Sequence, residues 1–384
     1  MTTNTKKIVT IVGTRPQIIK ASAISRAIKA SFKNEINEII VHTGQHYDQN
    51  MSQIFFEELG IPNPTYNINV GSGRHGKQTA KMIEGIEEIL LKEKPDAVIL
   101  YGDTNSTIAG SLAATKIHIP IVHIEAGLRS FNKKMPEEIN RIACDHMSSM
   151  LFSPTKQGIL NLKNEGFNTQ TNKKATIDKP NIYHCGDIML DNSMYFAEKE
   201  HVSDLMDTLE LEEGNYVLCS VHRENNTDTE DNLNNILNAL LNCQEKTNLK
   251  IVLPLHPRTK KKINQLKNQE LVKKITNNIN ISIIPPAGFL DIISLEKKSR
   301  LIITDSGGLQ KEAYFFKKPC VILREQTEWV EIVENGNAIL TGSNYDKIND
   351  AVIHLLSKND YTYPPIFGDG KAGPLICSKI LSDL

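Results

Sequence analysis

The chain has 384 residues, of which 40% are hydrophobic and 23% charged, and its formal net charge is -1 at pH 7. This length predicts two domains, and the near-neutral charge argues against bulk attraction to nucleic acid or to an anionic membrane. The charge therefore leads us to expect no nucleic-acid partner. We also expect no membrane partner, because no stretch approaches a membrane span and the start lacks a signal-peptide core. The six cysteines are scattered without metal spacing, which predicts free thiols in a reducing cytoplasm.

Short apolar runs alternate with helix-periodic segments along almost the whole chain. This alternation predicts an α/β fold with parallel sheets covered by helices on both faces. Helical patterns are clearest at 16–30, 76–93, 104–116 and 229–246. Strands are predicted at 7–13, 38–44, 97–103, 119–125, 150–155, 181–187, 216–222, 249–256, 281–287, 301–307 and 319–325.

These strands are too many for one compact open sheet, and the polar segment 166–182 is typical of the approach to a domain boundary. We predict two Rossmann-like doubly wound domains, at 1–180 and 181–365, followed by a helix at 366–384 that docks back on the first domain. In such sheets ligands bind beyond the carboxyl ends of the strands. Polar residues that follow strands are therefore the candidate site.

The stretch GTRPQIIK follows the first predicted strand. Gly13 permits a tight turn, Arg15 lies at the positive end of the following helix, and Lys20 lies one turn further on. An anion site is favoured over a merely solvated helix start. After the second strand, Gln45 and His46 lie in a polar loop and could face a ligand.

Two carboxylates end apolar strands. Asp103 precedes a helix, and helix capping and proton handling are equally open for it. Glu125 is followed by a sharp turn and is expected to be poorly solvated, so it needs a partner, which Arg129 or His123 could supply. At the next helix start, Glu138 is expected to be structural, while Glu137 remains open between the two roles.

The second half repeats the pattern. His222 and His256 follow successive strands, and two such histidines could bind a metal. We discount a metal because Arg223 and Arg258 beside them would oppose a cation, whereas an anionic ligand suits these arginines.

The strongest local signal is ITDSGGLQKEA. Ser306, Gly307 and Gly308 open a helix after a strand, so backbone N–H groups can approach a phosphate. Glu312, one turn into the helix, is placed to accept from both hydroxyls of a ribose. Nucleotide binding is therefore favoured, although the pattern is neither a P-loop nor a GxGxxG motif.

Taken in order, GTRPQIIK, HTGQHYD, YGDTNST, HIEAGLRS, MPEEINR, SVHREN, PLHP and TDSGGLQKEA resemble the motifs of the non-hydrolysing UDP-N-acetylglucosamine 2-epimerases. The resemblance implies two Rossmann-like domains facing across a cleft, the GT-B arrangement, and usually a homodimer. It implies interconversion of UDP-GlcNAc and UDP-ManNAc for surface polysaccharides, by elimination and re-addition of UDP. It implies no cofactor, neither NAD nor an essential metal, and a UDP-sugar as the partner.

The resemblance also implies a role for each candidate residue. Asp103, Glu125 and Glu137 match the catalytic carboxylates, with His222 beside the leaving group. Gln45, His46 and His256 match a region where some relatives bind a second, activating UDP-sugar. The substrate contacts would come from Arg15, Lys20, Arg129, Phe289, Ser306, Gly307, Gly308 and Glu312.

Two departures bear on the substrate. The family's common GTRPE start is GTRPQ here, with Gln17, and Trp329 and Val330 replace the Arg and Pro of a TERPE form. The stretches HTGQHYDQNMSQIFFEELGI and TEWVE look like a branch that acts on UDP-2,3-diacetamido-2,3-dideoxyglucuronate, which is the alternative substrate. A GT-B glycosyltransferase, a hydrolysing epimerase and a non-catalytic UDP-sugar-binding protein are the rival functions.

Overall fold

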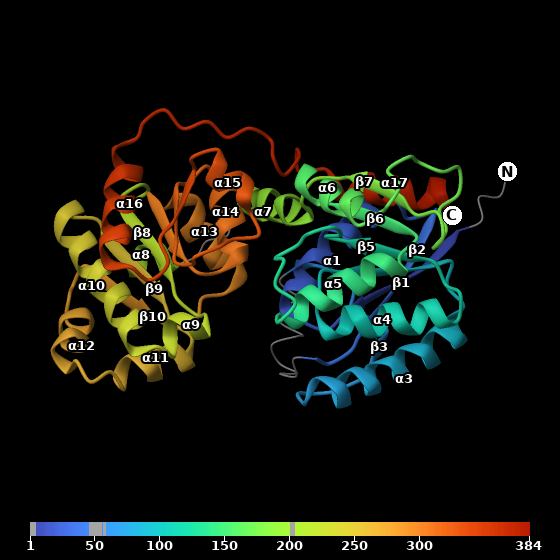
Figure 1. The fold of residues 1–384 in the computed structure, drawn as a ribbon, viewed down its shortest axis with the longest axis horizontal. Coiled ribbons are helices and arrows are strands. Elements are labelled where there is room, and N and C mark those ends of the chain that lie inside the picture. The colour runs from blue at the N-terminus through green and yellow to red at the C-terminus, as the bar shows by residue number, and fades with distance from the viewer. Residues whose placement is uncertain (1–4, 46–55, 57–58, 200–203) are drawn as a thin grey trace. The chain divides into compact units, whose positions relative to one another are not determined.

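The computed structural model describes residues 5–45, 56, 59–199 and 204–384. They form two compact units, one of Met1–Asn192 with Pro365–Leu384 and the other of Ser193–Pro364. Each unit holds one parallel sheet with helices packed against it (Figure 1). The predicted α/β class with two doubly wound, Rossmann-like sheets is confirmed. In the described ranges, no helix is both long enough and apolar enough to cross a membrane.

The sheet of the first unit runs in the order β3-β2-β1-β4-β5-β6-β7. Its order reverses between β1 and β4, which pair through Ile8↔Ala97, so the topological switch point of this sheet lies there. The strands are β1 (Lys6–Val12), β2 (Ile36–His42), β3 (Tyr66–Asn67), β4 (Ala97–Tyr101), β5 (Ile121–Ile124), β6 (Met150–Ser153) and β7 (Asn181–His184).

The helices of this unit cover both faces of the sheet. Val9 and Ile11 of β1 join a core with residues of α3 and α4. Thr10 points to the other face, where its hydroxyl donates to Glu38, and Glu38 accepts from Ser25 of α1. The helices are α1 (Arg15–Ala27), continued by a π-helical turn at Ile28–Phe32, α3 (His75–Glu93), α4 (Asn105–Lys116), α5 (Pro136–Met147), α6 (Lys156–Asn164), α7 (Ile188–Glu198) and α17 (Ala372–Asp383).

The predicted domain boundary at 180 precedes β7, which pairs with β6 and so extends the first sheet. Along the chain, the boundary between the two units falls within α7, between residues 192 and 193. Helix α17 packs against α1 and belongs to the first unit.

The second unit repeats the winding, in the order β10-β9-β8-β11-β12-β13, with its switch point between β8 and β11. Its strands are β8 (Tyr216–Ser220), β9 (Lys250–Pro254), β10 (Ile281–Ile284), β11 (Leu301–Thr304), β12 (Cys320–Ile322) and β13 (Ala338–Leu340). Its helices are α8 (Asp204–Thr208), α9 (Glu224–Thr227), α10 (Glu230–Thr247), α11 (Pro257–Asn264), α12 (Gln269–Thr276), α13 (Phe289–Lys298), α14 (Gly307–Phe315), α15 (Val330–Glu334) and α16 (Tyr345–Ser357).

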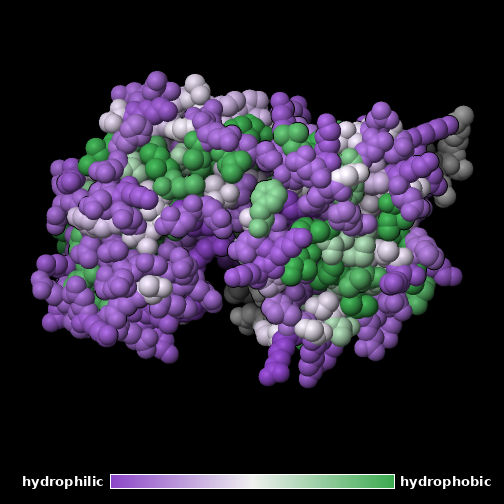
Figure 2. Space-filling view, in the orientation of Figure 1, coloured by the Kyte–Doolittle hydropathy of each residue, from purple (hydrophilic) through white to green (hydrophobic). Residues whose placement is uncertain are grey.

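All eleven predicted strands are present, and the described residues add two short strands that were not predicted, β3 and β13. Both lie at a sheet edge and have two and three residues, too few to show a periodic pattern. The surface in view is mostly hydrophilic, with smaller apolar patches (Figure 2).

Candidate active site

The turn after β1 lies against the start of α4. A Cβ on Gly13 would come within 2.1 Å of Ser106 Oγ and 2.2 Å of Thr43 Oγ1, so this close approach requires glycine. Gln17, fully buried in α1, accepts from Gly13 N at 2.9 Å and donates to Tyr101 O at 2.9 Å. Gln17, the residue at which this chain departs from the GTRPE pattern, therefore connects the turn after β1 to the end of β4.

Glu125 lies in the turn after β5 and is 6% exposed. Its carboxylate forms an ion pair with Lys20 of α1. A Cβ on Gly102 would lie 3.2 Å from Glu125 Oε2 and 3.4 Å from Lys20 Nζ, so the pair lies directly against the residue that precedes Asp103. The turns after β1, β4 and β5 thus bring Lys20, Asp103 and Glu125 to one place on the first unit, at its switch point.

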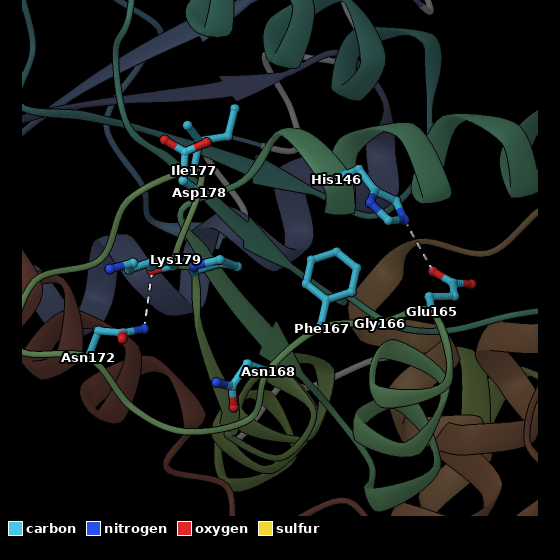
Figure 3. Close-up of a pocket in the computed structure, with 10 residues that line it drawn as sticks. His146, Glu165, Gly166, Phe167, Asn168, Asn172, Ile177, Asp178 and Lys179 are labelled. Carbon is cyan, nitrogen blue, oxygen red and sulfur yellow. Dashed lines mark hydrogen bonds and ion pairs between the residues drawn. The ribbon is translucent and has the colours of Figure 1, made fainter.

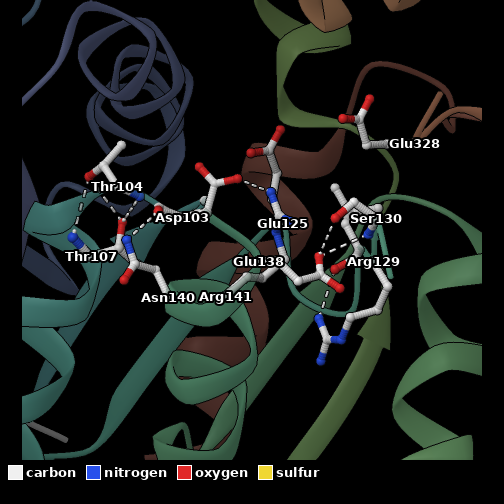
Figure 4. Close-up of polar contacts among 12 residues, drawn as sticks. Asp103, Thr104, Thr107, Glu125, Arg129, Ser130, Glu138, Asn140, Arg141 and Glu328 are labelled. Carbon is white, nitrogen blue, oxygen red and sulfur yellow. Dashed lines mark hydrogen bonds and ion pairs between the residues drawn. The ribbon is translucent and has the colours of Figure 1, made fainter. Parts of the chain in front are cut away.

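Asp103 does not cap the helix that follows it. The N-cap of α4 is Thr104, whose hydroxyl accepts from Ser106 N and Thr107 N. The Asp103 carboxylate instead pairs with Arg141 of α5, and its backbone carbonyl accepts from Asn140 at 2.9 Å (Figure 4). Of the two roles left open from the sequence, capping is therefore excluded for Asp103.

The two glutamates at the start of α5 differ in environment. Glu137 is exposed, whereas Glu138 is 2% exposed. The Glu138 carboxylate accepts from Ser130 N at 2.8 Å, Ser130 Oγ at 3.0 Å and Phe131 N at 3.0 Å (Figure 4). Glu138 therefore holds the preceding loop, which is the structural role expected for it.

The partner expected for Glu125 needs correction. Arg129 and His123 were the candidates, but both bind Asp145, at 2.7 Å each. Arg129 also forms two hydrogen bonds with Glu165, each 2.7 Å. Glu125 forms its ion pair with Lys20 instead. The two residues are 105 positions apart, so no local sequence pattern predicts this contact.

The candidates for a second ligand site have structural contacts of their own. Gln45 accepts from Ser106 N at 3.1 Å and Ser106 Oγ at 2.8 Å, at the start of α4. His256 is the N-cap of α11 and accepts from Arg258 N. His46 lies outside the described residues. Binding of a second UDP-sugar by these residues stays a prediction.

In the second unit, Asp305 joins the turns after β8 and β11. Its fully buried carboxylate accepts from His222 N, Arg223 N and the Asn226 amide, all at 3.0–3.1 Å. The His222 side chain is exposed at the surface, but partial desolvation by surrounding protein lowers its pKa, and His256 lowers it further against the opposing effect of Asp305. The lowered pKa favours the neutral imidazole of His222.

The glycine-rich turn starts α14 at Gly307. The first N–H groups of a helix have no partner within the helix, so this end suits an anion. Trp329 supports the turn by donating from Nε1 to Gly307 O at 3.0 Å, and Lys311 Nζ lies 4.3 Å from the centre of the Trp329 ring. The tryptophan that departs from the TERPE form therefore contacts the predicted phosphate-binding turn.

Glu312 lies one turn into α14 and is almost buried. A Cβ on Gly308 would lie 3.7 Å from Glu312 Oε2, so the carboxylate stays beside the glycine-rich turn. Glu296 of α13, which no sequence pattern indicated, is 0% exposed. Burial and then the neighbouring Glu312 raise the pKa of Glu296 well above its ordinary value, which favours the protonated form of Glu296 beside the predicted ribose contact.

Phe289 begins α13, and its ring is buried edge-on against Phe196, with 5.4 Å between ring centres. The substrate contact that the resemblance implies for Phe289 stays a prediction. Arg15 is the half-buried first residue of α1, beside the turn at Gly13.

A pocket of about 560 Å³ opens on the first unit (Figure 3). His146, Glu165 and Phe167 line one side of it. His146 Nε2 lies 3.6 Å from Glu165 Oε2, and its ring packs 4.7 Å from Phe167. Among the described residues, no group of three or more histidine, cysteine, aspartate or glutamate side chains is placed to hold a metal ion.

Comparison with known proteins shows the family of the chain. Residues 28–381 match the profile of the UDP-N-acetylglucosamine 2-epimerase family. A UDP-N-acetylglucosamine 2-epimerase homolog of Methanococcus maripaludis is 50% identical, over 95% of this chain and 97% of that protein. The UDP-2,3-diacetamido-2,3-dideoxy-D-glucuronate 2-epimerase of Pseudomonas aeruginosa is 46% identical, over 97% and 99%.

Among solved structures, the Methanocaldococcus jannaschii UDP-GlcNAc 2-epimerase in complex with UDP-GlcNAc and UDP is similar, with a TM-score of 0.82 and 43% identity. The similarity covers 97% of this chain and 99% of that one. The resemblance predicted from the ordered motifs is confirmed, and the chain belongs to the UDP-N-acetylglucosamine 2-epimerase family.

Proposed function

We propose that the protein is an isomerase that interconverts UDP-GlcNAc and UDP-ManNAc. The observation that carries the proposal is the Glu125 carboxylate, buried beside Lys20 and next to the turn of Asp103, in a chain of this family. A buried carboxylate at a sheet switch point, next to a second carboxylate, suits proton transfer to and from a bound sugar.

The reaction proceeds through elimination. The C2 proton of the sugar is not next to a carbonyl, so its direct removal would leave an unstabilised carbanion. A carboxylate takes the C2 proton while the C1–O bond breaks, UDP leaves with the bonding electrons, and 2-acetamidoglucal forms. Re-addition of UDP at C1, with a proton delivered to the other face of C2, completes the epimerisation. The sequence is redox-neutral and therefore requires no oxidant.

Each group has a proposed part in this scheme. Asp103, Glu125 and Glu137 handle protons near the sugar ring. Arg15, Lys20 and neutral His222 stabilise the departing diphosphate or donate to it. In the second unit, the start of α14 at Ser306, Gly307 and Gly308 holds phosphate oxygens. Glu312 accepts from the ribose hydroxyls.

Incubation with UDP-GlcNAc in deuterated water tests the proposal. We expect a reversible mixture of two UDP-sugars, each with deuterium at C2. A glycosyltransferase requires an acceptor, a hydrolysing epimerase releases free ManNAc, and a binding protein turns nothing over. Failure to incorporate deuterium into any UDP-N-acetylhexosamine would contradict the proposal.

A second substrate is supported by a specific similarity. The Pseudomonas aeruginosa relative that is 46% identical is named for UDP-2,3-diacetamido-2,3-dideoxy-D-glucuronate. The TEWVE stretch that contains Trp329 fits the same branch. The deuterium experiment repeated with this nucleotide sugar decides between the two, because the true substrate gives the higher kcat/KM.

We further propose that the protein acts as a cytoplasmic homodimer that supplies precursors of surface polysaccharides. The family resemblance supports this proposal. Light scattering coupled to size-exclusion chromatography tests the dimer, and a mass of 43.0 kDa, that of one chain, would contradict it.

A further inference from the structure

A buried network of charged side chains contacts the turns that carry Asp103 and Glu125. His123 of β5 and Asp145 of α5 are both completely buried. His123 Nδ1 lies 2.7 Å from Asp145 Oδ1, and His123 Nε2 lies 2.8 Å from Gly102 O. The second oxygen of Asp145 lies 2.7 Å from Arg129 and accepts from Gly127 N at 3.1 Å. His123, Arg129 and the turn at Gly127 therefore meet at one carboxylate, and His123 connects that carboxylate to the turn at Gly102.

The contacts of His123 define its protonation state. A backbone carbonyl accepts hydrogen bonds and donates none, so Nε2 carries a hydrogen. Asp145 accepts from Arg129 and Gly127 as well, which favours its ionised form, so Nδ1 carries the other hydrogen. Burial would lower the pKa of His123, but Cys144 and Asp145 beside the ring outweigh burial and raise that pKa well above its ordinary value. His123 is an imidazolium ion.

The backbone groups held by this network belong to the turns that carry the proposed proton-handling residues. Gly102, whose carbonyl binds His123, immediately precedes Asp103. Gly127, whose N–H binds Asp145, comes two residues after Glu125. Both glycines have left-handed backbone angles, with φ of 61° and 79°. Because glycine has access to many backbone conformations, such turns keep one shape only when the surrounding structure holds them.

We propose that His123, as an imidazolium ion held by Asp145, is a positioning residue that sets the relative placement of the Asp103 and Glu125 carboxylates. The two ring nitrogens of His123 connect Gly102, just after β4, to Asp145. Asp145 in turn accepts from Gly127 N in the turn after β5. The inference rests on the proposed epimerase function for its catalytic consequence.

Arg129 and Glu165 complete the network on its outer side. The Arg129 guanidinium forms ion pairs with both Asp145 and Glu165, so it balances the charge of Asp145. Glu165 reaches the pocket of Figure 3, where His146 is its neighbour. We therefore propose that Arg129 holds Asp145 in place and does not bind substrate.

Nuclear magnetic resonance tests the charge state without reference to activity. In protein labelled with ¹⁵N-histidine, we expect both His123 ring nitrogens to give protonated-type shifts that stay constant from about pH 6 to 9. The signal is assigned by its loss in His123→Gln. A neutral tautomer of His123 at pH 7 would overturn the proposal.

Kinetics of Asp145→Asn test the positioning role. Asparagine keeps the shape, but it cannot hold the ring in its charged form, so His123 becomes neutral and the two turns loosen. We expect kcat to fall about 10- to 100-fold, because small displacements of reacting groups have such effects, while KM stays nearly unchanged. The control is Leu90→Ala, which removes core side-chain volume on α3 and lowers stability without touching the network.

The outcomes separate the two proposals. If wild-type protein converts no UDP-sugar, the proposed function fails and the resonance experiment still tests the imidazolium ion. If wild type is active and Asp145→Asn has a wild-type kcat, the positioning role is wrong. If Leu90→Ala, melting at the same temperature as Asp145→Asn, loses kcat to the same degree, the loss reflects stability alone and the positioning role is again wrong.

Discussion

Glu125 adopts a left-handed backbone conformation, with φ of 71°. For a residue with a side chain this costs about 1–2 kcal/mol, so the surroundings must compensate. Two hydrogen bonds do so, since Glu125 N and Ala126 N both donate to Phe152 O, at 3.1 and 3.0 Å. A strained glutamate paired with a lysine is unusual as a purely structural feature, and it is consistent with the proposed catalytic role.

Replacement of Glu125 by glutamine tests this role. Glutamine keeps the size but cannot take a proton, so deuterium exchange at C2 should fall at least about 100-fold. UDP-sugar affinity, measured by calorimetry, should stay within a few-fold of wild type. Glu88→Gln, on the exposed side of α3, is the matched control and should leave exchange unchanged. Exchange by Glu125→Gln near the wild-type rate would remove Glu125 from the mechanism.

Gln17 provides a second test at this scale. Its amide nitrogen donates to Tyr101 O and Thr107 Oγ1, at 2.9 and 3.0 Å. A glutamate here would set an ionised oxygen against the Tyr101 carbonyl. We expect Gln17→Glu to destabilise the protein by about 1–3 kcal/mol in urea unfolding. The exposed Gln170→Glu should change stability little, and equal stability of the two variants would show that the buried amide is dispensable.

Helix α17 is the element that returns the chain to the first unit, and carboxylates fasten both of its ends. Asp191 of α7 accepts from Ala372 N at 3.1 Å and Gly373 N at 2.8 Å. At the other end, Asp383 accepts from Asn181 at 2.7 Å and Tyr183 at 2.6 Å. The helix is thereby attached to both α7 and β7.

The pKa of Asp191 predicts how this attachment depends on pH. Burial raises that pKa from 3.8 to about 6, so the folded protein holds a proton that the unfolded chain releases. The Asp191 contribution to stability is therefore greatest below about pH 4 and falls as pH rises to about 6. Thermal melting of wild type and Asp191→Asn between pH 4 and 7 measures it. The stability of the variant relative to wild type should rise across this interval, and a constant difference would contradict the assignment.

The whole molecule consists of two units with the same winding, and their chain paths differ. The second unit is the single segment Ser193–Pro364, whereas the first needs both ends of the chain. The second unit also has its own continuous core, which includes Val217, Leu240, Ile251 and Ile303. A separate core and a continuous segment are the usual conditions for independent folding.

A fragment of residues 193–364 should therefore fold alone. Because it contains the start of α14 and Glu312, we expect it to bind UDP, as measured by calorimetry, but to catalyse no deuterium exchange. The same fragment with Glu312→Ala should keep its circular dichroism spectrum and bind UDP more weakly. A folded fragment without UDP affinity would place the nucleotide site elsewhere.

The sequence by itself determined the class of fold, all but the shortest strands, the family and the positions of the proposed acidic groups. It did so because strand and helix periods, helix starts and strand-end polar residues are local patterns. The tertiary structure decided which groups meet. Lys20 pairs with Glu125, Asp145 gathers His123 and Arg129, and Glu296 lies beside Glu312. These contacts depend on strand order and helix packing across many residues, and no local pattern records them.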